Sequence, residues 1–137
     1  MLRLVYVSCA TTSFSNAKLL EMVKRARARN GALDVTGMLL YKDGNFIQAL
    51  EGKGSAVREI FETIRRDPRH QAVTVVLNEI DSARHFEQPL GFRHLTDPEG
   101  PIVPSLNPSM SASARKSCLK RNMKDCVELL EFFQDYA

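Results

Sequence analysis

The sequence contains no tryptophan, no apolar run near the roughly 18 residues that cross a membrane, and no leader-like N-terminus. Its three cysteines form no close ligand pair, and their odd number argues against a disulfide framework. A net charge of +3, with basic residues scattered over predicted helix surfaces, is too small to indicate a nucleic-acid partner. We therefore expect a reduced cytoplasmic protein that binds neither membranes nor nucleic acid.

Signals for catalysis are also weak. His70, His85 and His94 fall in a predicted loop, a turn and a strand end, without metal-ligand spacing. Ser8 beside a histidine would form a nucleophile pair, but no third group orients it. No glycine-rich phosphate loop precedes a helix. We expect no metal site and no catalytic nucleophile.

The clearest positive signal is a β-hairpin. Two apolar runs, residues 34–42 and 45–51, flank an Asp-Gly pair, which is typical of tight hairpin turns. Strand side chains alternate between faces, so Gln48 shares one face with Phe46 and Leu50. A buried carboxamide without a partner costs about 1–3 kcal/mol. Gln48 must therefore bond to another polar group.

At 137 residues the chain is long enough for one domain, and hydrophobic periodicity predicts the α+β class. The expected elements are a strand at 2–8, a helix at 17–29, the two hairpin strands, a helix at 55–66, a strand at 72–80 and a weaker strand at 91–95. Ser55 should cap the second helix and Gly31 should terminate the first. The apolar run at 72–80 is predicted to be a central strand. This order is the ferredoxin-like βαββαβ pattern, with both helices on one face.

Three polar side chains converge in that arrangement. The first strand and the second hairpin strand are neighbours in mid-sheet, so Tyr6 and Gln48 can both face the helices. The side chain of Asn30, at the end of the first helix, is predicted to point toward the same space. Each of the three could simply satisfy another, but the convergence of a phenol with two carboxamides favours a bound polar ligand.

The opposite face of the sheet is also apolar and requires a cover. Four of the six prolines fall within residues 97–110, which we interpret as an extended connector after a core domain at 1–96. Residues 111–137 are expected to be helical and to cover that face. Their basic residues come first and their acidic residues last, which opposes the macrodipole of one long helix. Two short helices, or antiparallel pairing with a second copy, would suit this charge order.

Four motifs, in this order and spacing, resemble those of BLUF domains, the blue-light sensors that use FAD. They are LVYVS around Tyr6, RN followed by VTGMLLY, GNFIQALEG around Gln48, and RRDPRH at 65–70. The resemblance covers residues 1 to about 95. The fold of that family agrees with the predicted order of strands and helices.

The resemblance implies a flavin, FAD or FMN, bound between the two helices. Tyr6 would be the photochemical electron and proton donor. Gln48 would lie between Tyr6 and the flavin ring and rearrange its amide after illumination, while Asn30 would hold the pyrimidine-like edge of the ring. The flanking positions, near the ring edge or the ribityl-phosphate side, would be Arg29, Asp67, Arg69 and His70.

The implied function is a non-enzymatic photoreceptor. Its signal would leave through residues 111–137, to an unidentified effector protein or within a homodimer or larger homo-oligomer. The family usually carries a Trp-Ser-Met stretch before Gly-Phe, whereas the segment Phe86–Phe92 is shorter and lacks it, with Leu90 in the Met slot. Two alternatives stay open. One is a flavin-binding relative without a productive photocycle, and the other is an acylphosphatase-like hydrolase, although the loop CATTSFSN lacks the arginine that such an enzyme needs.

Overall fold

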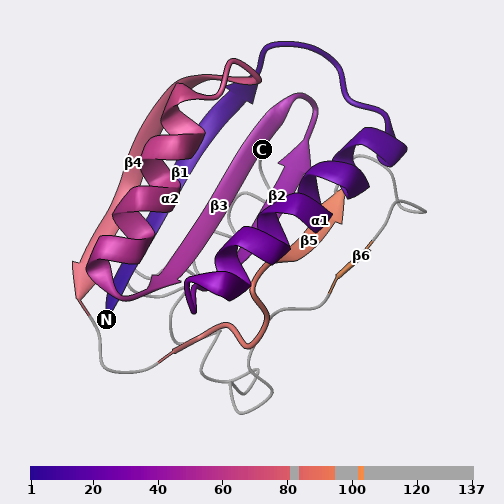
Figure 1. Cartoon of the computed structure of the whole chain (residues 1–137). Helices are drawn as coiled ribbons and strands as arrows, with labels where there is room; N and C mark the ends of the chain where they lie inside the picture. The colour runs from indigo at the N-terminus through magenta and orange to yellow at the C-terminus, as the bar shows by residue number, and fades with distance from the viewer. Residues whose placement is uncertain (81–83, 95–101, 104–137) are drawn as a thin grey trace, which may run out of the picture.

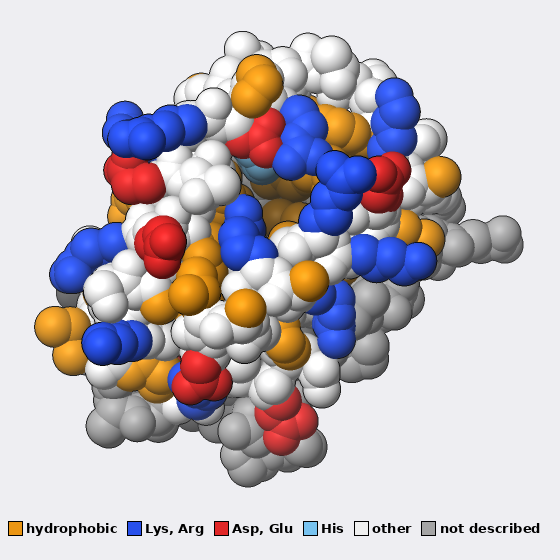
Figure 2. Space-filling model, in the orientation of Figure 1, with side chains coloured by type: hydrophobic (Ala, Val, Ile, Leu, Met, Phe, Trp, Pro, Cys, Tyr) orange, Lys and Arg blue, Asp and Glu red, His pale blue; other side chains and the backbone are white. Residues whose placement is uncertain are grey.

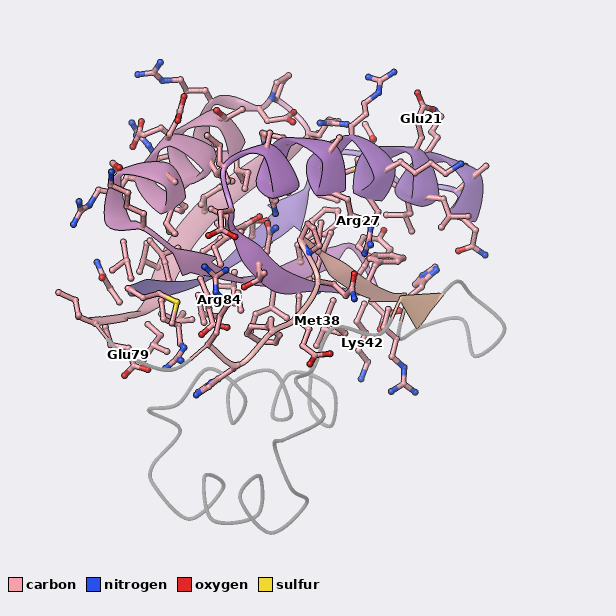
Figure 3. All side chains as sticks on the ribbon, turned by 60° about the horizontal axis from the view of Figure 1, so that its bottom comes forward. Glu21, Arg27, Met38, Lys42, Glu79 and Arg84 are labelled. Atoms are coloured by element: carbon pink, nitrogen blue, oxygen red, sulfur yellow. The ribbon has the colours of Figure 1, made fainter. Side chains whose placement is uncertain are left out.

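The computed structural model describes residues 1–80, 84–94 and 102–103 (Figure 1). The elements are β1 (Leu2–Ala10), α1 (Asn16–Ala32), β2 (Thr36–Lys42), β3 (Asn45–Gly52), α2 (Gly54–Arg66), β4 (His70–Ile80), β5 (Gly91–His94) and β6 (Ile102–Val103). The sheet order is β4-β1-β3-β2-β5-β6. Strands β4, β1, β3 and β2 lie side by side in the order expected of a ferredoxin-like sheet. Both helices lie on one face of this sheet (Figures 1 and 3). The predicted helical cover at 111–137 lies outside the described residues.

Helix α1 covers the predicted range but ends later than predicted. It begins after Ser15, whose Oγ accepts a hydrogen bond from the Lys18 amide at 3.2 Å, as an N-cap should. The prediction that Gly31 terminates the helix is wrong, because α1 continues through that residue. Leu33 is the C-cap, and Asp34 takes the left-handed backbone, with φ of 54°, that reverses the chain. The buried residues of α1 are Leu19, Val23 and Asn30.

Helix α2 also starts differently from the prediction. Lys53 is its N-cap, without a side-chain capping bond, so the predicted Ser55 cap is wrong and Ser55 lies in the first turn. The helix ends at Arg66 as predicted, because the proline after Asp67 holds that residue in an extended conformation. The face of α2 toward the sheet buries Ala56, Val57, Ile60 and Ile64.

Strand β4 is an edge strand, which corrects the predicted central position. Within the described residues it pairs with β1 alone. Val75 and Val76 are each 41% exposed, and Ile80 is 83% exposed. A continuous apolar run does not by itself distinguish a central strand from an edge. Here β1 occupies the place between β4 and β3, as the ferredoxin-like order requires.

The hairpin forms the centre of the sheet. Asp43 and Gly44 have φ values of 49° and 81°, and positive φ at both residues is what a type I′ turn requires. Strand β3 lies between β1 and β2, with Tyr6 opposite Gln48 on one side and Leu39 opposite Gln48 on the other. Gln48 is thus fixed in the middle of the sheet.

Within the described residues, no helix is long and apolar enough to cross a membrane.

The sheet face opposite the helices is apolar, as predicted. Its buried cluster includes Phe86, which packs on this face from the segment before β5. Met38 belongs to the same cluster and lies on the side of the sheet away from the helices in Figure 3. The other buried members are Val5, Leu40, Ile47 and Ala49.

Candidate functional site

A cavity of about 200 Å³ opens between α1 and α2, above the middle strands of the sheet. Its apolar walls come from both helices, from β2 and from the segment before β5. Figure 2 shows a hollow at this place, with hydrophobic side chains at the bottom and basic side chains around the mouth. The apolar lining residues are Met22, Ala26, Leu39, Ile64 and Leu90.

Tyr6 and Gln48 line this cavity as a hydrogen-bonded pair. The Tyr6 hydroxyl donates to Gln48 Oε1, and the two residues are 1% and 3% exposed. Burial raises the pKa of the Tyr6 phenol well above its usual range, so the phenol stays protonated and the pair stays neutral. The Tyr6 ring packs against the Phe61 ring from α2, with centroids 5.7 Å apart. The predicted convergence of these two side chains is correct.

Asn30 is fully buried at the end of α1, beside the cavity but outside its lining. Its Nδ2 donates to the Pro89 carbonyl at 2.9 Å, whereas its Oδ1 has no hydrogen-bond partner among the described residues. Arg29, which does line the cavity, likewise has a buried Nε without a partner. An unpaired buried polar atom costs about 1–3 kcal/mol. These two atoms fit a ligand such as flavin, whose ring edge carries an N–H donor between carbonyl acceptors.

The remaining predicted site residues form one side of the mouth. Arg69 binds Asp67 with both ends of its guanidinium, at 2.5–3.0 Å, and this bond lowers the pKa of the Asp67 carboxyl. His70 Nδ1 lies 2.8 Å from Ser8 Oγ, and burial lowers the pKa of the imidazole. Six of the seven predicted site residues therefore line the cavity, and Asn30 adjoins it.

The mouth is electropositive. Arg25, Arg29 and Arg69 line the cavity with a single carboxylate, Asp67. A neighbouring hollow of about 330 Å³ shares Arg25 and Arg69 and adds Lys18 and Glu21, so basic side chains still outnumber acidic ones. Such a charge distribution suits a ligand whose neutral ring lies inside and whose anionic groups lie at the surface. Among the described residues, no group of three or more His, Cys, Asp or Glu could hold a metal ion.

Sequence reasoning missed the groups that hold the wall of the cavity. Arg27 of α1 donates to the Leu90 carbonyl at 2.5 Å and to Gln88 Oε1 at 3.2 Å. Met22 was also missed, although it lies one helical turn before Ala26 on the same face and could have been found from that spacing. The bonds of Arg27 leave no signal in the sequence, because the segment they reach is about 60 residues away.

Comparison with solved structures supports the fold. The dark-state structure of BlrB, a BLUF protein, is 26% identical, with a TM-score of 0.70, and the match covers 99% of this chain and 96% of that chain. BlrP1 of Klebsiella pneumoniae, solved with FMN and cyclic diGMP, is also 26% identical, with a TM-score of 0.73. That match covers 99% of this chain and 35% of the BlrP1 chain.

Comparison with known sequences gives relatives with different outputs. The photoactivated adenylate cyclase subunit alpha of Euglena gracilis is 33% identical over 115 residues, which are 84% of this chain and 11% of that protein. The blue light- and temperature-regulated antirepressor BluF of Escherichia coli (strain K12) is 42% identical over 69 residues, 50% of this chain and 17% of that protein. The chain therefore spans only a small part of the length of these relatives.

The family profile agrees with the site. The profile described as sensors of blue-light using FAD matches residues 1–89, which include the cavity residues from Tyr6 to His70. This match favours the sensor family over the hydrolase alternative, because it covers strands β1 to β4 and both helices. The cofactor of the family is FAD, and the buried unpaired atoms beside the cavity fit it. The chain belongs to the BLUF family of flavin-binding blue-light sensors.

Proposed function

We propose that this domain is a blue-light photoreceptor in which illumination rearranges the hydrogen bond between Tyr6 and Gln48. The observation that carries the proposal is that this pair is neutral, buried and in the wall of the cavity. A phenol and a carboxamide can each act as donor or acceptor, so the pair can change its bonding without burying a new charge. A reversible switch needs that property.

The chain's own residues supply the binding of FAD. The free Oδ1 of Asn30 would accept from a ring N–H group, and the buried Nε of Arg29 would donate to an acceptor. The cations at the mouth, Arg25 and Arg69 with Lys18 beside them, would hold the phosphates. FMN carries the same ring and one of these phosphates, so the site accommodates it as well.

When bound, the flavin absorbs blue light and accepts an electron. Tyr6 would supply the electron and the proton, and burial raises the pKa of its phenol, so the proton stays on Oη in the dark. The bond from Oη to Gln48 Oε1 is the contact through which that proton would leave, and the proton and the electron would both return to Tyr6 to restore its hydroxyl. Rotation of the Gln48 carboxamide then exchanges its oxygen and its NH₂ group. The hydroxyl of Tyr6 must find a different partner, which changes the hydrogen bonds around the ring.

The output of the switch is proposed from the relatives. One is named a cyclase subunit and another an antirepressor, which indicates that similar sensor domains serve different effectors. We propose that this domain is itself a non-enzymatic sensor acting in the cytoplasm. Its altered state would be read by an effector protein or by a second copy of the chain, through residues 111–137.

Two substitutions test the proposal. Tyr6→Phe removes the donor hydroxyl and Gln48→Leu removes the carboxamide, and both should bind flavin and stay yellow. Both should lose the light-induced red shift of the flavin absorption. Tyr41→Phe is the matched control, because Tyr41 is a second buried phenol outside the cavity lining, and it should keep the shift. A normal shift in either cavity variant would contradict the proposal.

A further inference from the structure

The segment at residues 88–90 is held by three consecutive carbonyl groups, each of which accepts a hydrogen bond from a different residue. One donor belongs to β2 and two are side chains of α1. The donors are the Gly37 amide at 3.1 Å, Asn30 Nδ2 at 2.9 Å and Arg27 Nη1 at 2.5 Å. The segment is thus attached to the sheet on one side and to the helix on the other.

Arg27 makes the most extensive of these attachments. Its guanidinium binds two acceptors of the segment, the Leu90 carbonyl and Gln88 Oε1. In Figure 3 its side chain reaches from α1 toward the sheet. The planar fork of arginine can hold two acceptors in fixed positions, which the single ammonium of lysine does less well. Asn30 lies one turn further along the same helix face.

Leu90, whose carbonyl Arg27 binds, is a wall of the cavity. It is fully buried and lines the cavity together with Tyr6 and Gln48. It also packs in one apolar cluster with Leu39, the cross-strand neighbour of Gln48. Leu90 and Gln48 thus line the same cavity, and Leu90 packs with the strand neighbour of Gln48. We expect the position of Leu90 to affect the space in which the Gln48 carboxamide turns.

We propose that Arg27 is a positioning residue of the light response, which holds Leu90 in place and thereby slows the return of Gln48 to its dark orientation. This inference rests on the proposed function. Arg27 lies outside the cavity lining, so its loss should leave flavin binding and the size of the red shift unchanged. The rate of recovery in the dark is the property that should change.

The test compares three variants of the full chain. Arg27→Met keeps a long apolar stem without hydrogen-bond donors, and Arg27→Lys keeps the charge without the fork. Lys24→Met removes one positive charge from an exposed position of the same helix and is the matched control. Dark recovery should be roughly fivefold faster or more in Arg27→Met, in line with the loss of a charge-assisted hydrogen bond, and intermediate in Arg27→Lys. Lys24→Met should recover like the wild type.

Recovery of Arg27→Met within about twofold of the wild type, well under the effect of one such bond, would overturn the inference. Equal acceleration in Lys24→Met, or loss of flavin from Arg27→Met alone, would also overturn it. If the wild type shows no red shift, the proposed function fails. Amide hydrogen exchange in the dark then tests separately whether Arg27 holds the segment at residues 88–90. Arg27→Met must speed exchange at Gly37, whose amide binds the Gln88 carbonyl, while Lys24→Met leaves it unchanged.

Discussion

On the helix-covered face of the sheet, Tyr6 and Gln48 form a neutral buried pair, whereas on the opposite face Arg3 and Glu51 form a charged one. Both pairs are direct cross-strand neighbours of β1 and β3, three residues apart along each strand. Alternation along the strands places them on opposite faces. The same two strands therefore carry two different ways of burying polar side chains.

The charged pair is fixed on every side. Arg3 and Glu51 are fully buried, with Nη2 and Oε2 2.7 Å apart, and Arg3 also binds Glu79 at 2.9 Å. The second oxygen of Glu51 accepts from the amides of His85 and Phe86, at 2.8 and 2.9 Å. Figure 3 shows Glu79 on the side of the sheet away from the helices.

Under the proposed function, the neutral pair is the part of the molecule that switches and the charged pair is a part that does not. Moving either member of a buried ion pair exposes an uncompensated charge, at a cost of several kcal/mol. A phenol and a carboxamide exchange donor and acceptor roles at far lower cost. The charged pair on one face can thus hold β1 and β3 in register while the neutral pair on the other face rearranges.

The largest predicted effect comes from breaking the charged pair. Arg3→Met leaves Glu51 buried without its cation and should lower the free energy of unfolding by about 3–5 kcal/mol. Arg65→Met, which breaks an exposed ion pair with Glu62, is the control and should change little. Urea denaturation measures both. Equal effects of the two substitutions would show that the buried pair is not an anchor.

Removing both charged partners sharpens the comparison. In Arg3→Met/Glu51→Met no unpaired charge remains, but the amides of His85 and Phe86 lose their acceptor. The double variant should therefore recover only part of the stability that Arg3→Met loses. Full recovery would mean that Glu51 does not hold this segment.

A smaller loss is expected on the neutral face. Gln48→Leu leaves the buried Tyr6 hydroxyl without its acceptor and should cost about 1–3 kcal/mol in the flavin-free protein. Adding Tyr6→Phe removes the stranded hydroxyl, so the double variant should be more stable than Gln48→Leu alone. A double-mutant cycle by urea denaturation measures this coupling. Strictly additive losses would mean that the two side chains do not form a pair.

The smallest predicted effect is a pH dependence from His70. Burial lowers its pKa below the ordinary 6.5, so on acidification the unfolded chain binds this proton first. The contribution of His70 to the free energy of unfolding is therefore fully present above pH 6.5 and is lost as the pH falls through the lowered pKa. One proton limits this loss to less than about 1.4 kcal/mol per pH unit. His70→Gln should remove this slope, whereas Asp67, whose pKa is also lowered, acts only below about pH 4. An unchanged slope in His70→Gln would contradict the prediction.

Local rules were enough to predict the neutral pair. The Asp-Gly turn sets the hairpin register, and alternation then places Gln48 on the face of Tyr6. The helix stripe places Asn30 at the end of α1, facing the interior. Each of these steps depends on neighbours in the sequence or on one standard topology, and the structure agrees with them.

The burial of the charged pair was not predicted in this way. The edge position of β4 does follow from the predicted ferredoxin-like order, and the apolar run at 72–80 misled because it was interpreted without that order. Arg3 alternates with apolar residues along β1, and nothing near it in sequence indicates that Glu51 and Glu79 lie within reach. The cation is buried because three strands meet there, which is a property of the assembled sheet. The bonds of Arg27 are of the same kind, because their two acceptors, the Leu90 backbone carbonyl and the Gln88 side-chain carbonyl, carry no distinctive sequence pattern.

We propose that a flavin beside Tyr6 and Gln48 makes this chain a light-driven switch. The most direct measurement is the absorption spectrum of the purified protein in the dark and after blue light, followed by extraction and identification of its flavin. We predict a flavin spectrum that shifts to the red on illumination and recovers in the dark, with FAD released on denaturation. A colourless protein, or a bound flavin whose spectrum does not respond to light, would contradict the account.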